Sequence, residues 1–244
     1  MSRSGWGSAA GLLLAIAVAA AQATVGHPGT VNFIDGQVAL EGKALTPGAL
    51  EGVEVGAGQT LSTEQGKAEV LLTPGAFLRL GDQTAIKMSS QSASNTSVEV
   101  LHGEAILEVV QPVTSRLEVV DGQARANIQR PGIYEFHAGH PAVAVVAGKA
   151  RRSLAGDALY AWSEQRSRTD AVASSDTAQA LVGTDPANWH GVGWYWNPFY
   201  ATWAYLPATY TISGPFGEKY FSARFYWVYA ASNNHSHGYF TAAQ

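Results

Sequence analysis

The 244-residue chain contains no cysteine, and only 14% of its residues are charged. The absence of cysteine excludes disulfide bonds, thiolate metal centres, thiol catalysis and a lipid anchor on cysteine. The charged fraction lies well below the roughly 25% of an average globular protein. The net charge is −4 and no basic cluster is present, so a nucleic-acid ligand is not expected. A disordered polyelectrolyte is excluded as well, because 46% of the residues are apolar.

The amino terminus carries the longest apolar run of the chain. Residues 1–23 combine Arg3, an apolar stretch over Ala9–Ala21 and the small-x-small sequence Ala21-Gln22-Ala23, a pattern typical of a secretory signal peptide. The alternative is an uncleaved anchor, although the stretch is short and alanine-rich for a hydrocarbon layer of ~30 Å. We expect export to the periplasm or the cell surface, and no membrane span in the mature chain.

Residues 24–152 consist of short runs in which apolar and polar residues alternate, with glycines between the runs. One phrase, a strand followed by glycine, a polar residue and a second strand, occurs four times, at Gly36, Gly103, Gly122 and Gly148. Glycine in such a setting predicts a tight turn between paired strands. A further hairpin is predicted around Thr73–Ala76, where Pro74 and Gly75 suit a type II turn. The pattern predicts an all-β domain of about ten short antiparallel strands.

Three segments of this region resemble a known family. They are GKAEVLLTPGAFLRL at 66–80, VEVLHGEA at 98–105 and VVAGKA at 145–150. Together they resemble the FecR domain, the periplasmic all-β part of iron-dicitrate-type signalling regulators and of many stand-alone exported proteins. The resemblance covers residues 26–152 and implies a FecR-like β-sandwich or β-roll.

The chain also departs from that family's pattern. Pro74-Gly75-Ala76 stands where the family has Asp-Gly-Ser, and Arg130–Tyr134 replaces a Gly-Thr step. The cytoplasmic anti-sigma segment and the membrane helix of full regulators have no counterpart in this sequence. The resemblance therefore implies the domain and not the transmembrane signalling role.

The remaining third of the chain is expected to form a helix with a linker (153–188) and an aromatic-rich, irregular extension (189–244). Asp157 is placed to cap a helix that ends near Ala173, and the polar residues after it predict the linker. Eighteen of the 25 aromatic residues lie between Trp189 and Phe240. Within the extension, extended strands or loops are expected up to Pro207, and a further strand is expected over 220–229.

Two interpretations of these aromatic rings are open. The rings can cover an exposed face or edge of the β domain, each burying ~150–250 Å². Alternatively, some remain exposed and form a stacking surface for a glycan or a partner protein. For the second case the expected binding residues are Trp194, Trp196, Tyr200 and Trp203, because nearby prolines keep their backbone extended.

No motif for catalysis or for a cofactor is present. One metal-like pattern is Asn233–His237, with histidines two residues apart, and a polar tail is the simpler interpretation. We therefore expect no catalytic residues, no metal and no cofactor. The leading functional hypothesis is a non-catalytic binding or scaffolding module that contacts an envelope protein or a glycan surface. The alternatives are an envelope-signalling accessory that contacts a receptor through a sheet edge and an envelope-polymer hydrolase.

Overall fold

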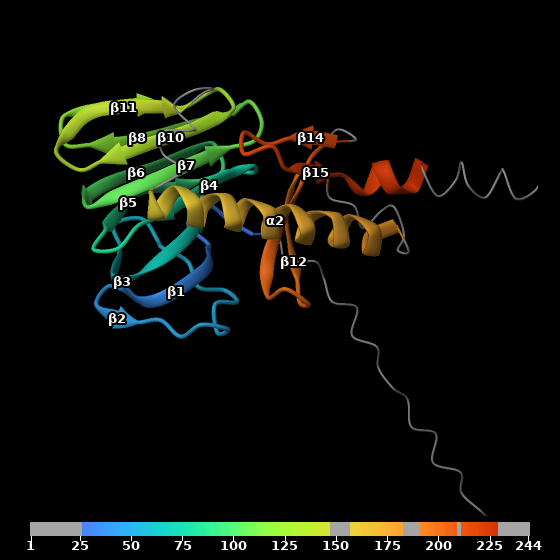
Figure 1. Ribbon diagram of the computed structural model, residues 1–244, viewed down its shortest axis with the longest axis horizontal. Helices are drawn as coiled ribbons and strands as arrows, with labels where there is room; N and C mark the ends of the chain where they lie inside the picture. Colours follow the sequence, from blue (N-terminus) through green and yellow to red (C-terminus); the bar gives the residue numbers. More distant parts are fainter. Residues whose placement is uncertain (1–25, 147–156, 183–190, 209–210, 229–244) are drawn as a thin grey trace, which may run out of the picture.

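The computed structural model describes residues 26–146, 157–182, 191–208 and 211–228 (Figure 1). The expected signal peptide (1–23), the fourth glycine corner at Gly148 and the Asn233–His237 motif lie outside the described residues. The structure is mostly β with one helix of 25 residues, α2 (Ala158–Val182), which agrees with the predicted class. Among the described helices none is long and apolar enough to cross a membrane.

The main sheet has eleven strands and curls so that its end strands, β9 and β11, approach each other (Figure 1). The order is β11-β10-β7-β4-β3-β5-β6-β8-β9, and β1 pairs with both β3 and β2. The strand bounds are β1 (Val31–Leu40), β2 (Lys43–Ala44), β3 (Thr60–Leu71), β4 (Ala76–Leu80), β5 (Ala85–Ser92), β6 (Asn95–His102), β7 (Glu104–Val109), β8 (Arg116–Asp121), β9 (Ala124–Asn127), β10 (Gly132–His137) and β11 (His140–Val146).

The sheet is mixed, because β6 and β8 run parallel while the other pairs are antiparallel. The expectation of antiparallel strands throughout is therefore wrong at this pair. The reason is the connection: β7 leaves β6 to pair with β4 and β10 elsewhere in the sheet. After β7 the chain crosses back, and β8 lies beside β6 and runs in the same direction, which requires such a crossover.

The two faces of the sheet bury different kinds of side chain. Ala68 and Val70 of β3 and Leu78 and Leu80 of β4 point into the apolar core on the inner face of the curl, as the alternation predicts. The neighbouring residues of these strands point to the outer face. That face is covered by α2 and by two hairpins, β12–β13 (Gly193–Asn197, Thr202–Leu206) and β14–β15 (Thr211–Ser213, Lys219–Phe221). Because both faces are covered, all five residues of β4 are buried.

The glycines that were expected at hairpin turns occupy different kinds of backbone position. Gly122 lies in the two-residue turn of the β8–β9 hairpin, and the hairpin around Thr73–Ala76 joins β3 to β4, as predicted. Gly36 instead lies inside β1, opposite Gly66 of β3, at a bulge. Gly103 joins β6 to β7, which pair with other strands and not with each other. The hairpin prediction is therefore wrong at Gly36 and Gly103, because a left-handed glycine also suits a bulge or a corner.

Helix α2 begins as predicted and ends later than predicted. The Asp157 side chain accepts a hydrogen bond from the Tyr160 N–H at 2.8 Å, as an N-cap does. The helix then continues nine residues beyond Ala173, through the stretch interpreted as a linker. Tertiary contacts stabilise this part: Ser174 Oγ accepts a hydrogen bond from the Phe221 N–H, and Asp176 accepts one from Asn197.

The strand expected over 220–229 is shorter than predicted. β15 ends at Phe221, and residues 223–228 are helical. Ser222 accepts a hydrogen bond from the Phe225 N–H, which favours a helix start. The ring of Phe221 then packs against Phe225 and Tyr226 within one helical turn.

We predict that Gly103→Ala lowers the free energy of unfolding by at least about 2–3 kcal/mol. A Cβ at residue 103, where φ is +80°, would lie 2.4 Å from Thr84 Oγ1 and 2.6 Å from the Gln83 carbonyl oxygen. Gly122→Ala is the matched control. Its φ is also positive (+56°) but nothing lies within 4 Å of the added Cβ, so only backbone strain of about 1 kcal/mol is expected. Urea unfolding measures both, and equal losses would contradict the prediction.

Candidate functional site

A buried ionic cluster lies where α2 crosses the outer face of the sheet. At its centre the Arg79 guanidinium (β4) donates hydrogen bonds to three carboxylates. They are Glu69 of β3 at 2.7 Å, Glu108 of β7 at 2.8 Å and Asp170 of α2 at 3.1 Å. All four side chains are fully buried. Because the partners come from the two neighbouring strands and the helix, this one side chain of β4 joins the sheet to α2.

A second guanidinium completes the cluster from the helix side. Arg166 donates hydrogen bonds to Glu69 at 2.9 Å and to Asp170, one turn along the helix, at 2.7 Å. Ser167 donates to Glu108 at 2.9 Å. Arg166 also lies over the ring of Phe33, 4.2 Å from its centroid, a cation–π contact. The cluster therefore reaches from the middle of the sheet to β1.

Two guanidinium groups face three carboxyl groups, so the cluster is neutral when one carboxyl is protonated. Burial raises the pKa of Asp170 well above its usual value, and the nearby Glu69 carboxylate adds to that rise. Burial also raises the pKa of Glu108. For Glu69 the effect of burial is outweighed by Arg166 and Arg79, which hold its pKa below the usual range. These pKa directions favour a protonated Asp170 and an ionised Glu69 in the folded protein.

Asn32 connects this cluster to the aromatic hairpin. Its amide donates to Glu69 at 2.8 Å. Its carbonyl oxygen accepts hydrogen bonds from Thr202 Oγ1 at 3.0 Å and from the Trp203 N–H at 2.7 Å. Because Asn32 is itself buried, the β12–β13 hairpin is fixed to β1 and β3 by polar contacts as well as by packing.

Two of the four expected binding residues are buried between this hairpin and the sheet. Trp194 is 1% exposed and Trp203 is 5% exposed, and both rings belong to the cluster that covers Leu71 and Phe77 on the outer face of the sheet. The expectation that they are exposed is therefore wrong. Strand alternation explains this, because the even-numbered residues of β12 and the aromatic residues of β13 face the sheet.

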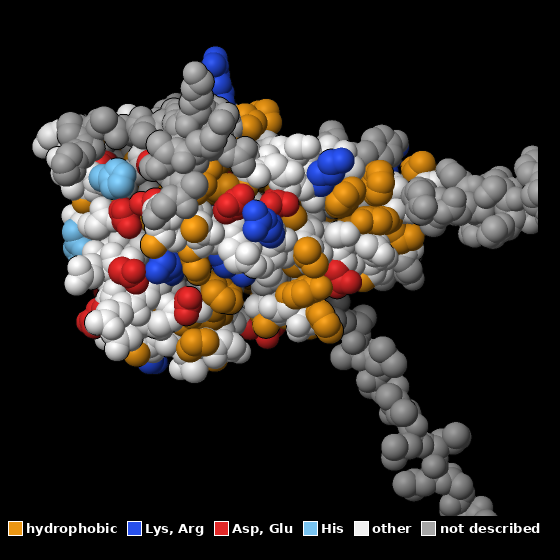
Figure 2. All heavy atoms as spheres, in the orientation of Figure 1, with side chains coloured by type: hydrophobic (Ala, Val, Ile, Leu, Met, Phe, Trp, Pro, Cys, Tyr) orange, Lys and Arg blue, Asp and Glu red, His pale blue; other side chains and the backbone are white. Residues whose placement is uncertain are grey.

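The other two expected residues, Trp196 and Tyr200, lie together at the end of the hairpin. They line a groove of about 100 Å³ between the hairpin turn and the loop after β2. We call this the aromatic groove, and its lining residues are Phe33, Ile34, Pro47, Gly48, Leu50, Trp196, Tyr200 and Ala201. Phe199, 80% exposed, packs edge-on against Tyr200 beside it. In Figure 2, hydrophobic side chains gather at the lower end of the hairpin.

Asn197 fixes the turn that presents these rings. Its side-chain oxygen accepts hydrogen bonds from the backbone N–H groups of Phe199 and Tyr200, at 3.0 and 3.2 Å. Its amide donates to Thr177 at 2.9 Å and to Asp176 at 3.1 Å on α2. An asparagine that bonds the backbone two residues on is a standard turn device. Here it also anchors the turn to the helix, so the groove is preformed.

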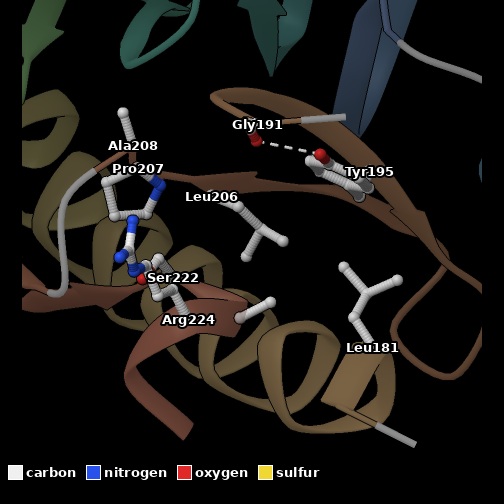
Figure 3. Close-up of a pocket in the computed structure, with 9 residues that line it drawn as sticks. Leu181, Gly191, Tyr195, Leu206, Pro207, Ala208, Ser222 and Arg224 are labelled. Atoms are coloured by element: carbon white, nitrogen blue, oxygen red, sulfur yellow. Dashed lines mark hydrogen bonds between the residues drawn. The ribbon is translucent and has the colours of Figure 1, made fainter. Parts of the chain in front are cut away.

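A second pocket, of about 250 Å³, lies on the other face of the hairpin (Figure 3). Leu206 projects into it, Leu181 of α2 lies at one side, and the Tyr195 hydroxyl donates to the Gly191 carbonyl at 2.9 Å. The Arg224 side chain extends toward Pro207 at the rim. The walls are mostly apolar, and the hairpin separates this pocket from the aromatic groove.

Half of the groove was not predicted from the sequence. Phe33, Pro47 and Leu50 come from the first quarter of the chain, about 150 residues from Trp196 and Tyr200. The aromatic-rich composition predicted only the hairpin residues. The cluster residues Glu69, Arg79 and Glu108 were also missed, although one signal was available: charged residues at alternate positions of otherwise apolar strands.

The comparisons with known proteins identify no relative. No family model matches the chain, and neither the curated proteins nor the solved structures contain a match.

The assigned charges predict opposite pH signatures for two amide variants. Glu69→Gln removes an ionised partner of two buried guanidinium groups and should destabilise the protein by about 3–5 kcal/mol at pH 7. Because the pKa of Glu69 is lowered in the folded state, the stabilisation it provides is lost as the pH falls below about 4.5. The difference between wild type and Glu69→Gln should therefore shrink in acid.

Asp170→Asn is the matched control, since the amide resembles the protonated carboxyl. We expect a loss of about 1–2 kcal/mol. The raised pKa of Asp170 means that wild-type stability falls as the pH rises above about 4, by up to ~1.4 kcal/mol per pH unit. The difference between wild type and Asp170→Asn should therefore shrink toward alkaline pH. Chemical denaturation between acid and mildly alkaline pH measures both. A difference for Asp170→Asn that grows with pH would contradict the proton assignment.

Proposed function

We propose that this protein is a non-catalytic binding or scaffolding module whose aromatic groove contacts its partner. The observation that carries the proposal is the arrangement of Phe199, Tyr200 and Trp196: aromatic side chains held partly exposed at a turn that Asn197 fixes from both sides. Large exposed apolar residues that gather in one place mark contact sites more often than scattered ones do. Preformed aromatic anchors are also the residues that dominate binding energies.

The acidic groups of the molecule support a binding role over a hydrolytic one. The carboxyl groups with the most perturbed pKa values, Glu69 and Asp170, are fully buried and occupied by guanidinium groups. An acid or base must reach its substrate within hydrogen-bond distance. These two are sealed under α2, so their shifted pKa values are explained by the architecture of the fold.

The partner and the location belong to the same proposal. An export signal at residues 1–23 and the FecR-like segments at 66–80 and 98–105 favour a periplasmic or cell-surface protein that contacts an envelope protein or a glycan. We further propose that the curled sheet corresponds to a FecR-like domain. The signalling alternative uses a sheet edge, and the approach of β9 and β11 to each other leaves these end strands less open to an added strand.

Tyr200→Ala and Phe199→Ala should each weaken binding to envelope material by roughly tenfold or more, because central aromatic anchors contribute about 2 kcal/mol each. Tryptophan fluorescence, titrated with soluble peptidoglycan fragments and with envelope extract, measures the affinity. Protease treatment of the extract separates the partner classes, since a glycan survives it and a protein does not.

Trp227→Ala is the matched control, because Trp227 is a 48% exposed aromatic residue on the 223–228 helix, outside the groove. Its affinity should stay within about twofold of wild type. Binding that all three variants retain equally, or no binding to either preparation, would refute the proposed function of the groove.

A further inference from the structure

The size of the aromatic groove limits what enters it. Its volume of about 100 Å³ is far below the roughly 300–1,000 Å³ of pockets that enclose a small molecule. A groove of this size accommodates a single side chain while the rest of the ligand lies across the surface. The ligand is therefore a chain that inserts one compact apolar group.

The two polar side-chain groups at the groove can each donate a hydrogen bond. Among its lining side chains only Trp196 and Tyr200 carry a polar atom. Within the part of the chain that the structure describes, neither the Trp196 indole N–H nor the Tyr200 hydroxyl has a hydrogen-bond partner. A sugar ring, which presents several hydroxyl groups, would find only these two polar side chains on the lining. A chain that offers carbonyl oxygens and lacks N–H groups suits two donors and an apolar floor.

The charges around the groove further restrict the chemical class of the ligand. No lining residue is charged. Arg166 lies over the Phe33 ring, but it is buried and paired with Glu69 and Asp170. Two further charged neighbours are acidic: Glu51 follows Leu50 and is exposed, and Asp176 is bonded to Asn197. Figure 2 also shows acidic side chains beside the hydrophobic ones at the end of the hairpin. An anionic polymer is disfavoured here, and a neutral or basic chain is favoured.

We infer that the aromatic groove binds an extended, proline-containing peptide segment of a partner protein. One proline ring fills the groove, and neighbouring peptide carbonyl groups accept hydrogen bonds from Trp196 Nε1 and Tyr200 Oη. A proline-rich segment keeps the polyproline II conformation before it binds, and Asn197 and Asn32 preform the groove. Little conformational entropy is then lost on either side, which is the physical basis of aromatic-groove recognition of such peptides.

This inference rests on the proposed function of the groove and is tested separately from it. Titration calorimetry of the full chain should use a synthetic peptide of about nine residues, three polyproline II turns, with prolines at every third position and a flanking lysine. The comparison ligands are the same peptide with alanine in place of proline and a neutral oligosaccharide. We expect the proline peptide to bind, and its alanine counterpart to bind at least about tenfold more weakly.

Two conservative variants remove the donors and keep an aromatic ring at each position. Tyr200→Phe and Trp196→Phe should each weaken binding of the proline peptide by roughly 3- to 10-fold, the contribution of one hydrogen bond. Trp227→Phe, outside the groove, should leave it unchanged. Circular dichroism checks that each variant is folded.

Each other outcome overturns the inference in a distinct way. If the alanine peptide binds as well as the proline peptide, or both donor variants bind like wild type, the groove does not recognise proline. If the oligosaccharide binds and Tyr200→Ala abolishes that binding, the proposed function stands and the peptide inference is wrong. If no ligand binds and Tyr200→Ala also leaves the binding of envelope material unchanged, both are wrong.

Discussion

The structure depends on how the charge of Arg79 is accommodated inside the protein. A guanidinium group without access to water is very unfavourable unless its nitrogens meet acceptors. Three carboxyl groups, from β3, β7 and α2, supply those acceptors within 3.1 Å. Sheet and helix therefore fit together in one arrangement, because any shift of α2 along the sheet would leave buried charges without partners. Apolar packing alone tolerates such shifts more readily.

The candidate binding site is built outward from this cluster. Glu69 accepts a hydrogen bond from Asn32, and Asn32 accepts one from the backbone of the β12–β13 hairpin. Asn197, at the end of that hairpin, accepts one from the backbone of the turn. Arg166 packs against the ring of Phe33, which lines the groove. Each contact is polar and directional, so the position of the exposed rings is fixed relative to the sheet. A site made of loop residues gains affinity from such preorganisation.

The local parts of the fold were predictable, because they depend on residues that are close in sequence. The β3–β4 hairpin, the faces of its two strands and the Asp157 cap all follow from short-range patterns. Gly36 and Gly103 were misassigned to hairpins because a left-handed glycine permits a bulge, a corner or a turn equally well. The last nine residues of α2 were missed, since their helical state depends on contacts with Asn197 and with Phe221.

The candidate site was half predictable for the same reason. The composition pointed to the aromatic hairpin, and Tyr200 is exposed there as expected, at 37%. Which rings face outward depends on which side of the hairpin meets the sheet, and this placed Trp194 and Trp203 inside. The groove also needs Phe33, Pro47 and Leu50, which only the pairing of β1 with β3 and the Asn32 contacts bring to the hairpin.

The amino-acid order by itself determined a mostly β chain, its β3–β4 hairpin, its helix start and its concentration of aromatic rings near the carboxy end. These properties follow from alternation, from glycine and proline backbone preferences, and from capping, all of which act over a few residues. The tertiary structure decided that Glu69, Arg79, Glu108, Arg166 and Asp170 share one buried cluster. It also decided which aromatic rings remain at the surface, because burial of a charge or a ring depends on what a distant segment places beside it.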